Sequence, residues 1–479
     1  MESLKQKTAR GLLWGSLNTG IQQILNLVFG IILARWLTKE DYGMVGMLMV
    51  FSALAGMLQE GGFISALNKR KDVSREDYNS VFWFNVVMGG LLYALLFFSA
   101  PLIADFYNEP ELTPLARFVF LGFFISAFNI SPRAVLFREL MVRETTIMGF
   151  AALVISGLVG ICMVFMGYSY WGLATQGVVY ALVITLMSYY YSHFRPMLHF
   201  SSKPIHEMFG FSGKLIVTYI FNILNQQLMN VILGYYYTKT EVGTFTQANK
   251  WNTMGHQFVT NMISGVAQPV FTKVEETRVR QQAVLRKMLR FTAMVSFPLM
   301  FGLAIVSREF IIITITEKWL ASADMLSLLC VWGAFVPIIT LLSNYVISRG
   351  KSNIYMWVTM VLCLMQVSVA YLMYPFGLSN MLTAFVAVNI AWLFVWFYFV
   401  QRENGLSLFV FLRDLSPYFL LSLALAALTW WTCSGISLLW GALLLKIAMM
   451  GSLYCLILYV SGSVIFKEGL TYIFKKKIS

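Results

Sequence analysis

Apolar runs of about 20 residues follow one another from Gly11 to Phe466, separated only by short polar gaps. A run of that length is what an α-helix needs to cross a hydrocarbon layer of roughly 30 Å. Lipid offers no hydrogen-bond partners, so a spanning segment must satisfy its own backbone groups, as a helix does. Membrane β-strands would instead show short stretches of alternating polarity. We therefore expect an all-α integral membrane protein with about 14 transmembrane helices.

The polar gaps place the boundaries of these helices. The expected segments are residues 11–36, 41–67, 79–104, 112–132, 144–167, 170–193, 210–237, 242–271, 286–307, 322–348, 353–375, 378–401, 415–433 and 437–465. The outer connections are short, which leaves little room for an external domain.

The distribution of charge gives this predicted topology a direction. The chain has 35 lysine and arginine residues against 22 aspartate and glutamate residues, and its formal net charge is +13. If the amino terminus lies in the cytoplasm, 27 of the 35 basic residues fall on cytoplasmic segments and six on outer segments. Basic residues concentrate on the cytoplasmic side of membrane proteins. We therefore predict that both termini are cytoplasmic, and we expect no nucleic-acid partner.

Two parts of the chain resemble each other at an offset of 200 residues. Ile32-Leu33, Thr38-Lys39 and Gly43 recur as Ile232-Leu233, Thr238-Lys239 and Gly243. Internal repeats are a common plan of secondary transporters, which bind substrate at the repeat interface. We expect two pseudo-symmetric six-helix lobes at residues 1–200 and 201–402, followed by two further helices and a basic tail at residues 403–479.

Amide side chains gather inside three of the predicted helices and share helix faces through spacings of three and four residues. A polar side chain in hydrocarbon is costly, so it tends to face the bundle interior or a hydrated cavity. Amides suit sugars, which need many donors and acceptors and little charge. The competing interpretation is that they hold helices together. The candidate cavity residues are Asn18, Gln22, Gln23, Asn26, Asn222, Gln226, Gln227, Asn230, Lys250, Gln257 and Asn261.

Four ionisable residues are candidates for headgroup binding or ion coupling. Lys250 lies about two turns inside its helix, where it is able to neutralise a phosphate, pair with a carboxylate or snorkel outward. Glu60 is a candidate proton or cation site. Arg290 is a candidate for attracting an anionic headgroup, or else a simple topology charge. His256 either titrates near neutral pH or is a hydrogen-bonded packing residue.

Sequence motifs of catalysis are missing. The chain contains no G-x-x-x-x-G-K-[ST] phosphate loop, no H-E-x-x-H and no C-x-x-C. Its four histidines and five cysteines do not have the spacing of metal ligands. We therefore expect no enzyme activity, no metal and no cofactor.

Four segments together resemble the Wzx-type polysaccharide transporters of the multidrug/oligosaccharidyl-lipid/polysaccharide exporter superfamily, and the resemblance covers nearly the whole chain. They are residues 34–43 (ARWLTKEDYG), 60–72 (EGGFISALNKRKD), 318–320 (KWL) and 348–351 (SRGK). Relatives often have an aspartate before the glycine that ends the second helix, and this chain has Glu60 there.

The resemblance implies a V-shaped, MATE-like fold and a flippase. Its substrate would be an undecaprenyl-pyrophosphate-linked oligosaccharide, moved from the cytoplasmic to the periplasmic leaflet of the bacterial inner membrane for O-antigen, capsule or exopolysaccharide assembly. Alternating access would be coupled to an H⁺ or Na⁺ gradient. The implied partners of this monomer are membrane lipids, a polysaccharide polymerase and chain-length proteins.

Three other functions stay open at this point. A drug/cation antiporter of the same superfamily should carry a buried carboxylate cluster and only about twelve helices. A lipid II flippase would share the fold but have a more cationic cavity. A membrane enzyme of polysaccharide polymerisation is expected to have larger outer loops.

Overall fold

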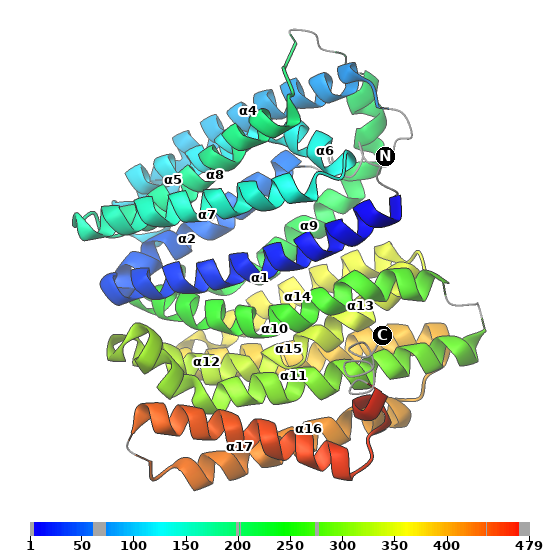
Figure 1. Ribbon diagram of the computed structural model, residues 1–479. Coiled ribbons are helices and arrows are strands. Elements are labelled where there is room, and N and C mark those ends of the chain that lie inside the picture. Colours follow the sequence, from blue (N-terminus) through cyan, green and yellow to red (C-terminus); the bar gives the residue numbers. More distant parts are fainter. Residues whose placement is uncertain are drawn as a thin grey trace. The chain divides into compact units, whose positions relative to one another are not determined.

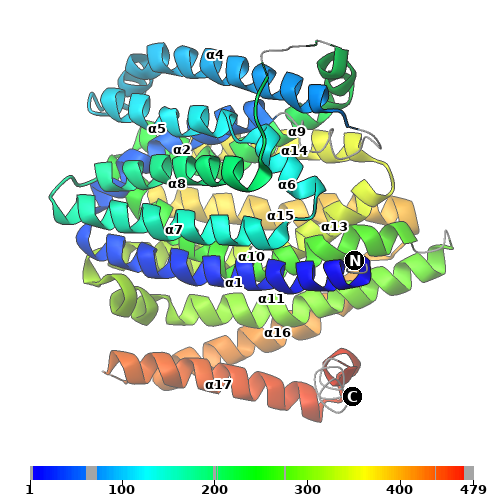
Figure 2. The ribbon, with the colours of Figure 1, turned by 45° about the horizontal axis from the view of Figure 1, so that its top comes forward.

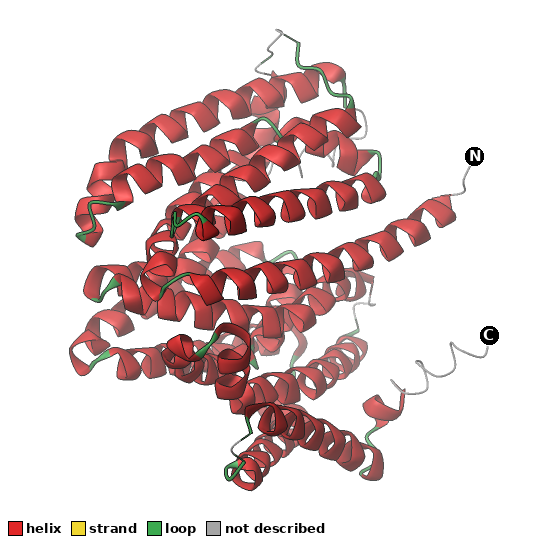
Figure 3. Cartoon of the chain, turned by 60° about the vertical axis from the view of Figure 1, so that its left-hand side comes forward, coloured by secondary structure: helices red, strands yellow, loops and turns green. Residues whose placement is uncertain are grey.

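The computed structural model describes residues 4–60, 73–197, 201, 203–273, 277–436 and 438–468, and within them the regular structure is helical (Figures 1 and 3). Each predicted segment overlaps one helix or one closely spaced pair. The helices are α1 (Leu4–Trp36), α2 (Lys39–Glu60), α4 (Arg75–Tyr107), α5 (Leu112–Ala127), α6 (Ile130–Arg138), α7 (Val142–Phe165), α8 (Trp171–Ser192), α9 (Lys203–Tyr236), α10 (Lys239–Lys273), α11 (Arg278–Ile315), η1 (Glu317–Trp319), α12 (Leu320–Gly333), α13 (Val336–Ser348), α14 (Ser352–Met373), η2 (Tyr374–Phe376), α15 (Leu378–Asn404), α16 (Leu408–Cys433) and α17 (Leu439–Val460).

The length and hydropathy of these helices confirm a multi-pass membrane protein. Over the residues that were described, nine helical segments are long and apolar enough to cross a bilayer, and the bent pair α5 and α6 brings the number to as many as ten. Helix α10 is not among them, because Lys250, His256 and several amides lower its hydropathy. The total of fourteen crossings stays a prediction.

The span formed by α5 and α6 is bent by 44° at a short break after Ala127. Pro132 lies in the first turn of α6, where a proline is tolerated because its missing N–H has no helical partner to lose. The Ser131 hydroxyl donates to the Tyr78 carbonyl at 2.8 Å and so anchors α6 to α4. The break leaves Asn129 between the two half-helices, with its side chain inside the first unit described below.

Two helix starts related by the sequence repeat carry matching caps. In α2, the Thr38 N–H donates to the Asp41 carboxylate at 2.8 Å, and the Asp41 N–H donates to the Thr38 hydroxyl at 3.2 Å. In α10, the Thr238 N–H donates to the Glu241 carboxylate at 3.1 Å. Such bonds satisfy donors that the first turn of a helix leaves open. The 200-residue repeat therefore corresponds to the same local structure at both positions.

The internal contacts divide the chain into two compact units, Met1–Gly243 and Thr244–Ser479. In the first unit α7 lies against α1 and α8, and α5 lies against α4 and α8 (Figure 2). In the second unit α11 contacts α12, α16 and α17. The predicted lobe boundaries at residues 200 and 402, and the V-shaped placement of the lobes, stay predictions.

Helix α11 forms the centre of the second unit. The Phe297 side chain is fully buried, and its ring makes edge contacts with the rings of Phe335 and Phe419. Helices in lipid associate through close packing and polar contacts, because the surrounding tails are as apolar as the side chains. Interlocking aromatic rings of this kind supply that packing. Polar contacts add to it at the same level, where the Ser296 hydroxyl donates to the Ala334 carbonyl at 2.8 Å.

Candidate functional site

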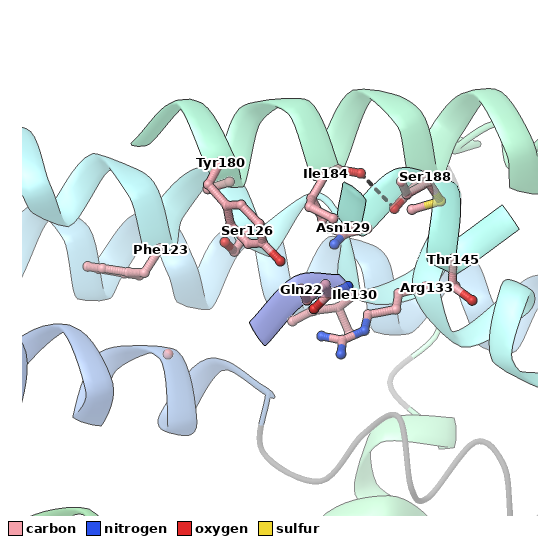
Figure 4. A pocket seen from close by; sticks show the side chains of 14 residues that line it. Gln22, Phe123, Ser126, Asn129, Ile130, Arg133, Thr145, Tyr180, Ile184 and Ser188 are labelled. Carbon is pink, nitrogen blue, oxygen red and sulfur yellow. Dashed lines mark hydrogen bonds between the residues drawn. The ribbon is translucent and has the colours of Figure 1, made fainter. Parts of the chain in front are cut away.

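A cavity of about 420 Å³ lies inside the first unit, around the break between α5 and α6. Helices α1, α2, α5, α6, α7 and α8 all contribute to its wall (Figure 4). The lining residues are Gln22, Gly56, Phe123, Ser126, Asn129, Ile130, Arg133, Thr145, Met148, Gly149, Tyr180, Ala181, Ile184 and Ser188.

Polar groups of several kinds share this cavity. Tyr180 reaches from α8 toward the side on which Gln22 of α1 and Arg133 of α6 lie (Figure 4). An arginine presents up to five N–H donors and a fixed positive charge, which suits a phosphate or carboxylate. Amide and phenol groups add donors and acceptors without charge. The cavity therefore combines the groups that bind sugar hydroxyls with one that binds an anion.

The hydroxyls in the cavity wall are oriented by their own helices. The Ser188 hydroxyl donates to the Ile184 carbonyl at 2.8 Å, a bond drawn in Figure 4, and the Ser126 hydroxyl donates to the Gly122 carbonyl at 3.0 Å. The Thr145 hydroxyl likewise donates to the Met141 carbonyl at 2.9 Å. Because these protons are held by backbone carbonyls, the oxygens offer lone pairs to a donor. Sugar hydroxyls are donors of that kind.

The predicted amides of α1 fall into different surroundings. Gln22 lines the cavity and is half-buried, which places it with the polar groups above. Gln23 and Asn26 are exposed and are not among the lining residues of this cavity. The side chain of Asn18 lies outside the described residues.

The predicted amides of α9 mostly bond within their own helix. The Asn222 amide donates to the Thr218 carbonyl at 3.0 Å. Asn230 is buried, and its amide donates to the Gln227 side-chain oxygen at 3.0 Å. Gln226 is exposed. Bonds within one helix do not hold separate helices together, so both the packing role and the substrate-binding role of these amides stay predictions.

The candidates on α10 lie in the second unit. Lys250 is half-buried. The Gln257 amide donates to the Asn261 oxygen at 2.6 Å, so these two predicted residues meet one turn apart. His256 is buried, and its Nδ1 lies 3.4 Å from the Thr260 hydroxyl. The arrangement is a polar stripe along one helix.

The remaining two candidates have different outcomes. The Glu60 side chain falls outside the described residues, as do residues 61–72 that follow it. The apolar pattern predicts a helix at residues 286–307, with Arg290 in its first turns. In the structure α11 begins at Arg278, so Arg290 lies twelve residues inside the helix. Its Nε donates to the carboxylate of Asp414 on α16 at 2.6 Å. Arg290 is therefore part of an ion pair inside the second unit.

Two buried carboxylates of the second unit escape sequence reasoning. Asp414 has a side chain only 1% exposed and pairs with Arg286 and Arg290. Glu309 is 12% exposed and pairs with Lys446 of α17 at 2.7 Å. Both lie just outside the ends of the predicted helices at 286–307 and 415–433. In the sequence, a charged residue beside an apolar run marks the end of a membrane helix. In the structure, each of these two carboxylates lies inside a helix, because a basic residue more than 120 residues away along the chain neutralises it.

Sequence reasoning also misses the cationic part of the cavity. Arg133 counts as a cytoplasmic topology charge in the sequence, and Asn129 and Tyr180 attract no notice there. One signal does mark the place: Pro132 follows Asn129 within an apolar run, and a proline there predicts a break in the helix. A broken membrane helix commonly lines a binding site.

Comparison with known sequences identifies relatives over most of the chain. A family model described as "Polysaccharide biosynthesis protein" matches residues 32–324. The lipopolysaccharide biosynthesis protein WzxC of Escherichia coli (strain K12) is 27% identical over 74% of this chain and 72% of its own length. The succinoglycan biosynthesis transport protein ExoT of Rhizobium meliloti (strain 1021) is 24% identical over 68% of this chain and 66% of its own length.

Comparison with solved structures confirms the fold class. The lipid II flippase MurJ in an inward closed conformation matches 98% of this chain and 100% of its own, with a TM-score of 0.74 and 15% identity. A multidrug resistance MATE family transporter of the MOP superfamily, in an inward-facing conformation, matches 82% of this chain and 98% of its own, with a TM-score of 0.66 and 17% identity. At these identities the likeness extends to the fold alone.

Proposed function

This chain belongs to the polysaccharide biosynthesis protein family, and on that premise we propose that it is a flippase for lipid-linked oligosaccharides. The substrate is an undecaprenyl-pyrophosphate-linked repeat unit of O-antigen, capsule or exopolysaccharide. It moves from the cytoplasmic to the periplasmic leaflet of the bacterial inner membrane, with both protein termini in the cytoplasm.

The observation that carries the proposal is the cavity around the α5–α6 break. Its volume of about 420 Å³ lies within the range of about 300–1,000 Å³ that small-ligand sites occupy. It therefore accommodates part of an oligosaccharide at a time. Gln22, Asn129 and Tyr180 supply neutral hydrogen-bonding groups, and Arg133 supplies a cation for a phosphate oxygen.

The transport cycle includes several steps for which we propose residues. Lys250 and the Gln257–Asn261 pair of α10 form a second set of polar contacts for the substrate. Glu60 and His256 are our candidates for coupling the cycle to an H⁺ or Na⁺ gradient, and alternating access moves the headgroup across. A polysaccharide polymerase and chain-length proteins take up the product.

A deletion of the gene tests the substrate class. We expect surface glycan to disappear while undecaprenyl-linked repeat units accumulate on the inner side of the membrane. Normal surface glycan with altered dye or drug efflux would point to the antiporter instead. Accumulation of peptidoglycan precursors would point to a lipid II flippase.

Complementation of that deletion tests the cavity. Arg133→Ala should reduce export by about ten-fold or more, because a charge-assisted contact to phosphate is lost. Arg133→Lys should restore export only in part, since lysine keeps the charge but lacks the planar fork. Arg143→Ala removes an exposed arginine of α7 that does not line the cavity, and it is the matched control. Equal export by the Arg133→Ala and Arg143→Ala variants would remove this cavity from the substrate path.

A further inference from the structure

One carboxylate in the second unit holds two arginines of a neighbouring helix. Arg286 and Arg290 lie one turn apart on α11, and both contact Asp414 of α16. The Arg286 Nε donates to Oδ2 at 2.6 Å and its Nη2 donates to Oδ1 at 3.1 Å, while the Arg290 Nε donates to Oδ1 at 2.6 Å. The geometry fixes both guanidinium groups against α16.

The exposure of these groups differs sharply within the cluster. The Asp414 side chain is 1% exposed, whereas the side chains of Arg286 and Arg290 are 34% and 40% exposed. An arginine has five N–H donors. Each of the two uses two of them on Asp414, so three per arginine remain for another acceptor. The carboxylate is therefore buried beneath donors that reach the surface.

A cavity of about 640 Å³ opens over these donors. Arg413, the residue before Asp414, is exposed and adds a third guanidinium group to its wall. Three arginines and one aspartate give the wall a net charge of +2. The hydroxyl residues Ser461 and Ser463 lie in the same wall. This end of the cavity is built to receive an anion.

The rest of the cavity wall is apolar. It consists of Pro417, Tyr418, Leu421, Ile457, Leu458, Gly462, Val464 and Ile465. The segment after α17 closes this side, and the ion pair between Lys287 and Glu468, at 2.6 Å, fastens it to α11. A soluble anion would contact the arginines but leave the apolar wall unfilled. A phospholipid has a phosphate for the arginines and an acyl chain for the apolar wall.

We propose that this pocket binds an anionic glycerophospholipid, with the phosphate at the three arginines and an acyl chain along the apolar wall. The predicted topology places these arginines on the cytoplasmic side, with 27 of the 35 basic residues of the chain. Anionic lipids give the cytoplasmic leaflet a negative surface potential, and basic pockets between membrane helices bind their headgroups. The site is separate from the substrate cavity of the first unit, and it stands whether or not the proposed transport function does.

Native mass spectrometry of the full chain in detergent tests this site. The probes are phosphatidylglycerol, phosphatidylcholine and undecaprenyl phosphate, each titrated into delipidated protein. We expect phosphatidylglycerol to bind at least about ten-fold more tightly than phosphatidylcholine, because the choline cation cancels the phosphate charge and is repelled by the three arginines. Arg413→Gln should remove most of that preference without disturbing the Asp414 ion pairs. Arg402→Gln removes an exposed arginine of α15 outside the pocket and should leave the preference intact.

A second variant tests the apolar wall independently of charge. Leu421→Trp narrows the cavity, so it should weaken phosphatidylglycerol binding while the three arginines remain. Equal binding of phosphatidylglycerol by the Arg413→Gln and Arg402→Gln proteins would overturn the proposal. A preference for undecaprenyl phosphate that Arg413→Gln abolishes would also overturn it, since the site would then belong to the transported lipid.

Discussion

Gly43 and Gly243, which the sequence repeat relates, each lie against the backbone of the other's helix. A Cβ atom on Gly43 would overlap the carbonyl group of Lys239, and a Cβ atom on Gly243 would overlap the carbonyl group of Lys39. The first turns of α2 and α10 thus approach each other as closely as backbone allows. A hydrogen bond from the Thr240 hydroxyl to the Glu40 carboxylate at 2.7 Å joins a second repeat-related pair at the same contact.

Substitution of either glycine should therefore destabilise the protein. Gly43→Ala and Gly243→Ala force backbone apart, and overpacking of this kind typically costs about 1–3 kcal/mol. Thermal unfolding of the purified protein, followed by size-exclusion fluorescence, measures the effect. Gly177→Ala is the control, because a Cβ atom there meets nothing within 4 Å. A midpoint for Gly43→Ala as high as that for Gly177→Ala would contradict the tight contact.

The buried ion pair of Lys446 and Glu309 should stabilise the second unit only as a pair. The two side chains are 7% and 12% exposed, and Lys446 also donates to the Ile305 carbonyl at 3.0 Å. Breaking a buried pair leaves one charge uncompensated and costs about 3–5 kcal/mol in soluble proteins. Lys446→Met should therefore lower the unfolding midpoint sharply, and Lys446→Met with Glu309→Gln should recover much of the loss. If the loss in the double variant equals the sum of the losses in Lys446→Met and Glu309→Gln alone, the two groups do not interact.

Neighbouring glutamines of α1 allow a matched test of the substrate cavity. Gln22 lines the cavity and Gln23 is exposed outside it. Loss of one neutral hydrogen bond costs about 0.5–1.5 kcal/mol, so Gln22→Leu should lower export two- to ten-fold. Gln23→Leu should leave export unchanged. Surface glycan in the complemented deletion strain measures both, and a larger loss for Gln23→Leu would place the substrate elsewhere.

Tyr170, in the connection before α8, should make stability depend on pH in the alkaline range. Burial raises the pKa of its phenol above the usual value of 10.0, and the nearby Glu111 carboxylate raises it further. The unfolded state therefore loses the phenol proton at a lower pH than the folded state does. The contribution of Tyr170 to stability is fully present below the unfolded pKa, and it is lost as the pH rises through the folded pKa. Between pH 8 and pH 11 the wild type should thus lose stability relative to Tyr170→Phe. If the stabilities of the two proteins change by the same amount between pH 8 and pH 11, the pKa of the Tyr170 phenol is not raised by folding.

Much of the fold is accessible from the sequence, because each apolar run carries its own signal for a spanning helix. The matching caps at Thr38 and Thr238 are also local, so the repeat predicts them. Asp414 and Glu309 are different, because their partners lie 124 to 137 residues away along the chain. A charge at the end of an apolar run then looks like a boundary until the packing supplies its counter-ion.

The candidate site was predicted less completely than the fold. Gln22 stands out because an amide in a membrane helix is costly. Arg133 does not, because a cytoplasmic arginine is the ordinary topological signal. Only the bend between α5 and α6 turns it toward Gln22 and Tyr180, and a bend depends on tertiary packing as well as on Pro132.

The ion pairs of α11 fasten α16 and α17 to it at two levels. Arg290 and Glu309 are nineteen residues apart, or about 28 Å along a helix. The two ion pairs are therefore separated by nearly the thickness of a membrane. Helix α17 also contacts α11 at a second level, because the Tyr454 hydroxyl donates to the Met294 carbonyl at 2.9 Å, and this makes α17 a reporter of α11. The native cysteine Cys455 on α17 is exposed, as is Cys162 on α7 of the first unit, whereas Cys330, Cys363 and Cys433 are buried. Spin labels on those two native thiols would therefore test the proposed alternating access in the unmodified sequence.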